Sequence, residues 1–266
     1  MKNKSPIPWE PEQLNRILYF APHPDDESLA GGCLLQRAAA CGAEVRVIFA
    51  TNGESNPWPQ RAFEKRWFLD HEVRSRWSLR RQREATSALQ VLGLPEACAA
   101  FLGLPDQGLT RLFQKDPHLL ATLLRQQIED FQPDIIFQPS QKDRHPDHRA
   151  LSRAIILGAG QMEMGSPQIF EYWVHGSTDV TPTLTFALTS EEMEMKRRAI
   201  LCHETQMLLS RRRFLSYVKD AEHFWAVTPL VNVSSLQLEE KALESLIIEE
   251  KMHLSVSSAS KSPEHT

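Results

Sequence analysis

The stretch ILYFAPHPDDESLAGG, residues Ile17–Gly32, decides the fold prediction. Its apolar, β-favouring start ends at Pro22, and a helical pattern begins at Glu27 and continues to Ala40. A strand followed by a polar, proline-containing turn and a helix is typical of the first βα unit of an α/β fold. Because ligand sites in such folds lie at the carboxyl ends of strands, we expect chemistry at this turn.

The same alternation continues along the chain. Further strands are predicted over Glu44–Ala50, Cys98–Leu102, Asp134–Gln138, Gln168–Val174, Thr183–Leu188 and Glu222–Val227. Helices are predicted over Arg74–Leu92, Pro117–Phe131 and Glu191–Leu209, the last capped by Ser190. The pattern predicts an α/β, Rossmann-like three-layer sandwich with a mostly parallel sheet and the active site at its strand C-terminal edge. We expect one domain over residues 1–254 and a Ser-rich disordered tail over 255–266.

Composition excludes several classes of protein. The chain has 266 residues, of which 41% are hydrophobic and 24% charged, and its net charge of −4 gives no reason to expect nucleic acid. No apolar run reaches the roughly 20 residues that a membrane span needs, and the first residues lack the apolar core of a signal peptide. Four cysteines without a CxxC pair predict free thiols and a cytoplasmic location. The sequence leaves homo-oligomerisation open.

A second polar cluster follows the predicted strand Asp134–Gln138. It is HPDH at His145–His148, and it should face the first cluster across the sheet edge. Three ligands from histidine and carboxylate, with one open position, make a hydrolytic zinc site, and His23, Asp26 and His148 would supply them. Iron(II) or another divalent ion fits the same ligands. Singly, each motif is also consistent with a helix cap and a solvated turn; together they favour a metal site.

The residues beside these ligands suggest the remaining roles. Asp25 neighbours a ligand but should point elsewhere, so we predict that it is the general base. His145, held by the carboxylate of Asp147, would be an imidazolium that faces a developing oxyanion. Histidines outside these clusters, among them His175, are expected to be surface or packing residues.

These residues resemble the LmbE-like, or PIG-L, family of zinc-dependent N-acetylglucosamine deacetylases. The shared segments run in family order and are APHPDDESLAGG, TNGES (51–55), RRQREA (80–85), LGLPDQGL (102–109), HPDHRAL (145–151) and KRRAILCHETQ (196–206). The resemblance implies the same zinc ligands, base and oxyanion pair as above. It also implies that Arg81 and Asp106 lie near the sugar hydroxyls of a small amino-sugar conjugate. Alternatively, Arg81 is an exposed helix charge and Asp106 forms a turn after Pro105.

The segment 55–79 carries three tryptophans and several arginines. It has two interpretations. One is a substrate lid, since aromatic faces stack on sugars and arginines bind anions. The other, slightly favoured, is an amphipathic helix whose tryptophans pack inward and whose arginines are solvated.

The leading functional prediction is a zinc-dependent N-deacetylase that releases acetate from an N-acetylglucosamine-type conjugate. One alternative is a non-catalytic, metal-stabilised sugar-binding protein, which would have no need of Asp25 or of the pair His145 and Asp147. A less favoured alternative is a magnesium-dependent phosphohydrolase, because magnesium prefers oxygen ligands to imidazole.

Overall fold

The computed structural model describes residues 16–65, 67–162 and 167–227. Within them, seven strands form one sheet in the order β3-β2-β1-β4-β5-β7-β6. The strands are β1 (Arg16–Ala21), β2 (Glu44–Thr51), β3 (Ala99–Leu104), β4 (Ile135–Pro139), β5 (Gln168–Tyr172), β6 (Leu184–Ala187) and β7 (Ala221–Val227). The first five are parallel, and β7 and β6 extend the sheet antiparallel. The predicted, mostly parallel sheet is confirmed.

Strand β1 pairs with β2 on one side and with β4 on the other. The order of the strands therefore reverses between β1 and β4. The helices that follow these two strands lie on opposite faces of the sheet. Such a switch point leaves a crevice at the carboxyl ends of the two strands. The two sequence clusters follow β1 and β4, so both open into that crevice.

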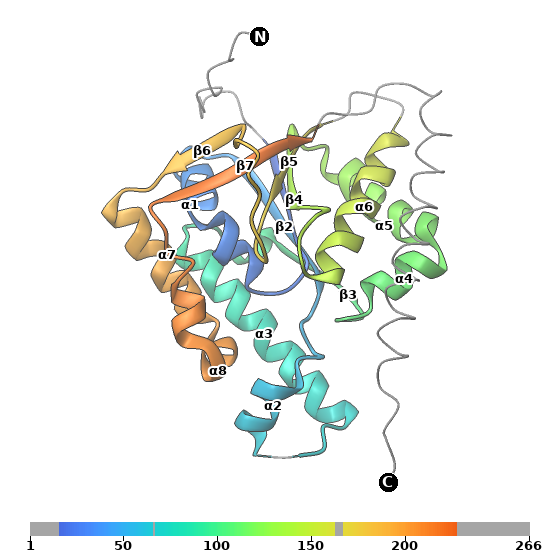
Figure 1. Cartoon of the computed structure of the whole chain (residues 1–266), viewed down its shortest axis with the longest axis vertical. Helices are drawn as coiled ribbons and strands as arrows, with labels where there is room; N and C mark the ends of the chain where they lie inside the picture. The colour runs from blue at the N-terminus through green and yellow to red at the C-terminus, as the bar shows by residue number, and fades with distance from the viewer. Residues whose placement is uncertain (1–15, 66, 163–166, 228–266) are drawn as a thin grey trace. The chain divides into compact units, whose positions relative to one another are not determined.

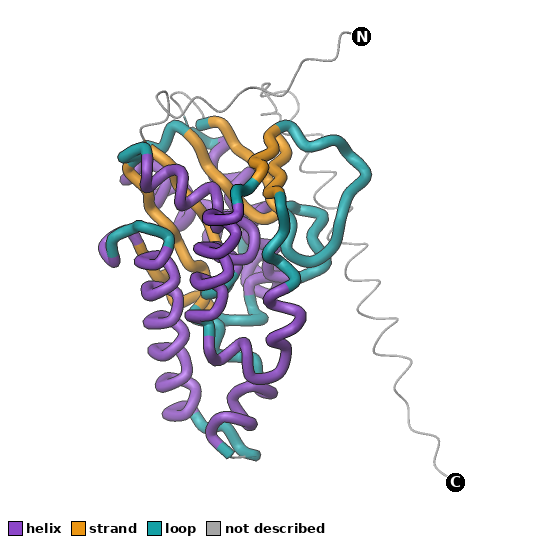
Figure 2. Tube along the Cα trace, turned by 90° about the vertical axis from the view of Figure 1, so that its left-hand side faces the viewer, coloured by secondary structure: helices purple, strands orange, loops and turns teal. Residues whose placement is uncertain are grey.

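Helices cover both faces of the sheet (Figure 1). They are α1 (Asp26–Ala40), α2 (Pro57–Glu64), α3 (His71–Val91), α4 (Leu109–Lys115), α5 (Pro117–Phe131), α6 (Pro146–Gly160), α7 (Ser190–Cys202) and α8 (Glu204–Leu215), with a short 3₁₀ turn, η2, at Glu96–Cys98. Helices α1, α3 and α7 pack together on one face, and α4, α5 and α6 on the other. Figure 2, turned by 90°, shows helices in front of the strands.

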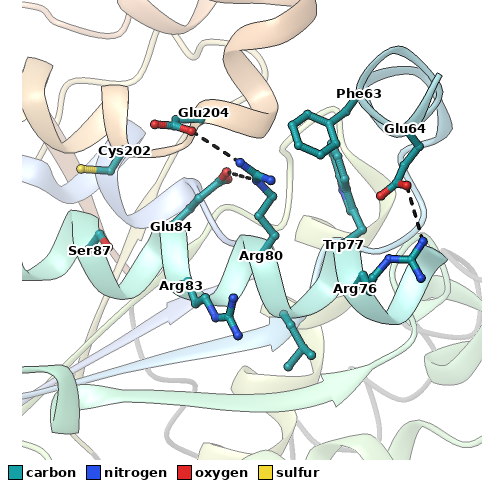
Figure 3. Close-up of a pocket in the computed structure, with 11 residues that line it drawn as sticks. Phe63, Glu64, Arg76, Trp77, Arg80, Arg83, Glu84, Ser87, Cys202 and Glu204 are labelled. Carbon is teal, nitrogen blue, oxygen red and sulfur yellow. Dashed lines mark ion pairs between the residues drawn. The ribbon is translucent and has the colours of Figure 1, made fainter. Parts of the chain in front are cut away.

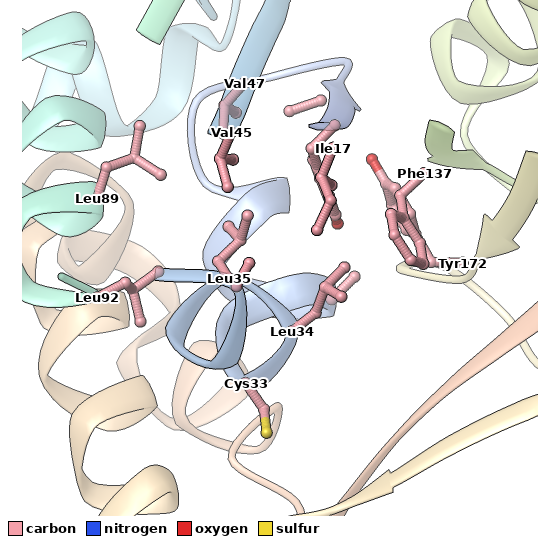
Figure 4. Close-up of a cluster of buried hydrophobic side chains, with 14 of the residues drawn as sticks. Ile17, Cys33, Leu34, Leu35, Val45, Val47, Leu89, Leu92, Phe137 and Tyr172 are labelled. Carbon is pink, nitrogen blue, oxygen red and sulfur yellow. The ribbon is translucent and has the colours of Figure 1, made fainter. Parts of the chain in front are cut away.

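The core follows from the period-two pattern of the central strands. On β1, Ile17 and Tyr19 face the α1 side, together with Val45 and Val47 of β2 and Phe137 of β4, and all are buried. Figure 4 shows Ile17, Val45, Val47 and Phe137 around the leucines Leu34 and Leu35 of α1 and Leu89 of α3. The alternate positions are buried as well, because the other helical layer covers the second face.

Three details differ from the sequence prediction. The predicted helix Glu191–Leu209 is two helices, α7 and α8, separated at His203, whose φ/ψ of −80°/58° is not helical. Its N-cap is Thr189 rather than Ser190, and Thr189 forms a capping box with Glu192. Helix α4 was not predicted, whereas α2 lies within the segment 55–79, for which an amphipathic helix was the slightly favoured interpretation. The predicted tail 255–266 lies outside the described residues.

Among the described residues, no helix is both long enough and apolar enough to cross a membrane.

A buried ion pair ties α7 to the antiparallel end of the sheet. Lys196 Nζ donates to Glu222 Oε1 at 2.6 Å, and both side chains are 2% exposed. The carboxylate of Glu222 also accepts the backbone N–H groups of Cys33 and Leu34 in α1. The pair thus joins β7, α7 and α1 at one point.

Lys196→Met should destabilise the protein by about 3–5 kcal/mol, because it leaves the Glu222 charge buried without its cation. Urea unfolding followed by circular dichroism would measure the loss. Arg197→Ala is the matched control, since the Arg197–Glu194 pair next to it is solvent-exposed and should matter little. Equal unfolding midpoints for both variants would contradict this role of the buried pair.

Candidate active site

Polar side chains gather where the five parallel strands end. His23 and Asp25 follow β1, Ser55 follows β2, and Asp106 follows β3. Asp143, His145 and His148 come after β4, and His175 after β5. Because parallel strands end at one edge, residues as far apart in the sequence as His23 and His175 meet there. The structure thus brings both predicted clusters together.

Asp26 lies between the two predicted histidine ligands. Its Oδ2 is 3.2 Å from His23 Nδ1 and 3.3 Å from His148 Nε2. All three side chains are buried or nearly so. Two imidazole nitrogens therefore converge on one carboxylate oxygen.

The outer nitrogen of each imidazole faces further carboxylates. His23 Nε2 is 3.3 Å from Asp106 Oδ1 and 3.4 Å from Asp147 Oδ2. His148 Nδ1 is 3.4 Å from Asp143 Oδ2. Burial alone would lower the pKa of His23, but its hydrogen bonds to Asp106, Asp147 and Asp26 raise the pKa well above its usual value. A carboxylate on the far nitrogen fixes the proton there and points the near nitrogen at the site.

This arrangement fits a divalent metal ion. Zinc–nitrogen and zinc–oxygen bonds of 2.0–2.2 Å at tetrahedral angles separate ligand atoms by about 3.3 Å, and the contacts of Asp26 Oδ2 are 3.2 and 3.3 Å. Neither ring nitrogen of the fully buried His148 makes a well-formed hydrogen bond, so Nε2 is available as a ligand atom. Among the described residues, three further combinations could hold an ion: His23, His145 and His148; Asp26, His148 and His175; and His23, Asp106 and Asp147. The predicted set of His23, Asp26 and His148 is not one of these three but takes its members from the first two.

Asp25 forms a buried ion pair next to these ligands. Arg81 Nη2 donates to Asp25 Oδ2 at 2.9 Å, and the same guanidinium donates to the carbonyls of Pro24 and Gly53. Burial raises the pKa of Asp25 while the Arg81 charge lowers it, and the net result is a value of about 6. A carboxylate with such a pKa can accept a proton near neutral pH and release it again.

The backbone of Asp25 is strained, and the buried side chains of Glu27 and His203 hold it in place. Its φ of 154° and ψ of −27° are unusual for a residue with a side chain, and such geometry costs about 1–3 kcal/mol. Glu27 Oε2 accepts the backbone N–H of Asp25 at 2.9 Å, and Glu27 Oε1 is 2.9 Å from His203 Nε2. Since Glu27 and His203 are fully buried, they hold the strained turn in place.

The prediction for His145 and Asp147 needs a correction. The carboxylate of Asp147 accepts the backbone N–H groups of Gln107 and Leu109, and it lies near His23 rather than holding the His145 ring. His145 Nδ1 instead accepts the backbone N–H of Asp147 at 3.2 Å. Burial and the charges of His23 and His148 lower the pKa of His145 to about 4. This low pKa favours a neutral imidazole over the expected imidazolium, and because Nδ1 accepts a hydrogen bond, the proton of the neutral ring lies on Nε2.

Arg81 and Asp106, predicted to lie near sugar hydroxyls, are only 3% and 8% exposed. Arg81 is thus a buried partner of Asp25 rather than an exposed helix charge. Asp106 Oδ1 faces His23, and its Oδ2 accepts the N–H of Ser55 at 2.7 Å. Burial raises the pKa of Asp106, but its hydrogen bond to His23 and the nearby positive charges lower it to about 2. Their contact with a sugar remains a prediction.

The segment 55–79 matches neither interpretation fully. Trp77 is 1% exposed, whereas Trp58 and Trp67 are 61% and 69% exposed. Arg61 lies over the rings of both exposed tryptophans. Figure 3 shows Trp77 of α3 beside Phe63 of α2. Both line a pocket of about 770 Å³. Only one of the three tryptophans therefore packs inward.

Sequence reasoning missed three functional candidates. Asp143 stands two residues before the HPDH motif, and that position could have flagged it as a partner of His148. His203 lies in the KRRAILCHETQ segment, which gave no role for it. His175, expected at the surface or in packing, has ring centroids of His148 and His145 at 5.1 and 5.5 Å. No local spacing marks His175, because only the fold places β5 beside β4.

Asp143→Asn should weaken zinc binding about 10–100-fold, because His148 loses the carboxylate that orients its ring. Competition with a chromophoric chelator would give the zinc dissociation constant. The control is Asp116→Asn, which keeps a capping side chain at the start of α5, away from the ligands. An unchanged dissociation constant in Asp143→Asn would remove this role.

Comparison with known proteins places this site in a family. The family PIG-L, GlcNAc-PI de-N-acetylase, matches residues 18–157. A 1D-myo-inositol 2-acetamido-2-deoxy-alpha-D-glucopyranoside deacetylase from Mycobacterium sp. (strain KMS) is 26% identical over 241 residues, which cover 75% of this chain and 77% of that protein.

Solved structures share the fold. The N,N'-diacetylchitobiose deacetylase of Pyrococcus horikoshii aligns with a TM-score of 0.62 and 21% identity, covering 82% of this chain and 85% of that one. A 4-carboxy-2-hydroxymuconate hydratase from Pseudomonas putida aligns with a TM-score of 0.59 and 17% identity, covering 82% and 98%. The fold alone therefore does not select the reaction. By its sequence match across β1 to α6, this chain belongs to the PIG-L family of GlcNAc-PI de-N-acetylases.

Proposed function

We propose that this chain is a metal-dependent hydrolase, with zinc as the preferred ion, that removes the N-acetyl group from a small amino-sugar conjugate of the N-acetylglucosamine type. The observation that carries the proposal is the Asp25–Arg81 pair, which lies directly beside the converging His23, Asp26 and His148. The deacetylase names of the Mycobacterium and Pyrococcus relatives support the same reaction.

His23, Asp26 and His148 would hold the ion, with Asp106, Asp147 and Asp143 behind the two imidazoles. When bound, a divalent ion polarises an acyl carbonyl and makes water more acidic. This chemistry suits hydrolysis of an amide.

Asp25 is assigned the proton transfers. Arg81 holds its Oδ2, and the carboxylate takes a proton from the attacking water. The water oxygen bonds to the acyl carbon, the carbon–nitrogen bond then breaks, and Asp25 returns the proton to the leaving nitrogen. The products are acetic acid and an amine, which at neutral pH become acetate and an ammonium group, so atoms and charge balance.

His145 is assigned the acyl oxygen. Because its Nδ1 accepts the N–H of Asp147, its Nε2–H is free to donate toward the site. A neutral donor stabilises negative charge as it develops on that oxygen. Arg81 and Asp106 are positioning residues in this proposal, for Asp25 and His23 respectively.

The two alternatives fit the site less well. A purely sugar-binding protein gains nothing from a strained, buried carboxylate with a pKa of about 6. A magnesium-dependent phosphohydrolase would favour oxygen ligands, whereas here two buried imidazoles point at Asp26. We propose the cytoplasm as the compartment, supported by four free cysteines, two of them buried.

Purified protein should release amine from at least one N-acetylglucosamine conjugate in a panel, lose the activity on chelation, and regain it with zinc. Asp25→Asn should keep stoichiometric zinc but turn over at least about a hundredfold more slowly, because the proton acceptor is gone. A fluorogenic amine assay and metal analysis measure both. Zinc-loaded wild-type protein that is silent across the panel, or full turnover by Asp25→Asn, would contradict the proposal.

Arg81→Met should move the acidic limb of the kcat/KM–pH profile to higher pH. The Arg81 charge lowers the pKa of Asp25, so its removal raises that pKa, and the base is deprotonated only at higher pH. Arg80→Met is the control, since Arg80 lies on the same helix but pairs with Glu84 and Glu204. A limb that stays in place or moves to lower pH would refute the coupling.

A further inference from the structure

His175 lies on the loop after β5, which hydrogen bonds from the side chains of Asp143 and Tyr217 hold in place. Its backbone N–H donates to Asp143 Oδ2 at 2.9 Å, and the N–H of Val174 donates to the same oxygen at 3.0 Å. From the turn after helix α8, Tyr217 Oη donates to the carbonyl of Val174 at 2.9 Å. The residue that orients His148 thus also fixes the place of His175, directly after β5.

The imidazole of His175 reaches the candidate metal ligands. One of its ring nitrogens lies within 4.8 Å of ligand atoms of Asp26 and His148. Its ring is also 5.5 Å from that of His145, centroid to centroid. His175 therefore borders the space where the acyl group of the proposed substrate would lie, on the β5 side.

Arg213 of α8 determines which ring nitrogen of His175 carries the proton. Arg213 Nη2 is 3.2 Å from His175 Nδ1. A guanidinium is always charged and has only donors, so Nδ1 must be the acceptor and carry no proton. The neutral ring then bears its single proton on Nε2.

This tautomer excludes the simplest alternative, a further metal ligand. An imidazole that binds a metal through Nε2 carries its proton on Nδ1. That proton would point at a donor of Arg213. Contact with Arg213 and metal ligation through Nε2 are therefore incompatible.

We propose that His175 is a catalytic hydrogen-bond donor, fixed as the Nε2–H tautomer by Arg213, that acts on the acyl oxygen together with His145. The inference rests on the proposed deacetylation for its substrate. Two neutral donors on one oxygen would form a small oxyanion hole, with one donor from the β4 end and one from the β5 end. Arg213 is the positioning residue.

The tautomer can be tested without substrate. In the full chain with ¹⁵N-labelled histidines, the His175 signal, assigned by its loss in His175→Gln, should show a protonated Nε2 both with and without zinc. Arg213→Glu places an acceptor beside Nδ1 and should shift the proton to Nδ1. Arg212→Glu makes the same charge change one residue away and should leave the signal unchanged. A wild-type signal with the proton on Nδ1 would overturn the assignment.

Kinetics then test the role. His175→Ala should lower kcat about 10–100-fold while KM and the zinc dissociation constant change less than about threefold, as expected for a donor used in the transition state. His175→Gln, which keeps an N–H donor, should recover part of kcat. Arg213→Glu should lower kcat, whereas Arg212→Glu should not.

Each contrary result has one meaning. Loss of zinc affinity in His175→Ala would make His175 a ligand, and a rise in KM alone would make it a ground-state binder; either overturns the proposal, as does unchanged kcat. If wild-type protein releases no amine while His175 keeps the Nε2–H tautomer, the proposed reaction fails and the catalytic role of His175 fails with it, whereas the tautomer set by Arg213 stands.

Discussion

The convergence of His23 Nδ1 and His148 Nε2 on one buried oxygen of Asp26 is the constraint on which the rest of the structure depends. Buried imidazoles and carboxylates are costly unless each has a partner. The sheet meets this requirement by ending five parallel strands at one edge, so that Asp106, Asp143 and Asp147 stand behind the two imidazoles. The switch point between β1 and β4 leaves room for the ligands between the two helical layers.

The helical layers also hold the proposed base. Arg81 comes from α3 and reaches the turn after β1, where it binds Asp25 and two backbone carbonyls. His203, at the break between α7 and α8, supports Glu27, which in turn holds the backbone N–H of Asp25. Stabilising contacts from three elements thus offset the unfavourable backbone of Asp25, and the strained turn is the place where the proton acceptor is needed.

Much of this could be predicted from sequence, since the strand–turn–helix pattern at Ile17–Gly32 and the HPDH motif carry strong local signals. The parallel sheet and the convergence of the two clusters followed from that pattern. The contacts that could not be predicted are those between residues far apart in the sequence. Asp147 is expected to hold its sequence neighbour His145, yet its carboxylate accepts hydrogen bonds from the amides of Gln107 and Leu109, 40 and 38 residues away. His175 was missed for the same reason, because its surroundings come from β4 and α8 and not from its own segment.

Anomalous diffraction at the zinc edge, from crystals of the zinc-loaded protein, tests the central claim most directly. Among the described residues, three other combinations of these side chains could also hold an ion, and only the ion's position distinguishes them from the predicted set. The account predicts one strong peak bound by His23 Nδ1, Asp26 and His148 Nε2, with Asp25 still paired with Arg81 and His175 outside bonding distance. A peak between His23, Asp106 and Asp147, or one bound by His175, would contradict it.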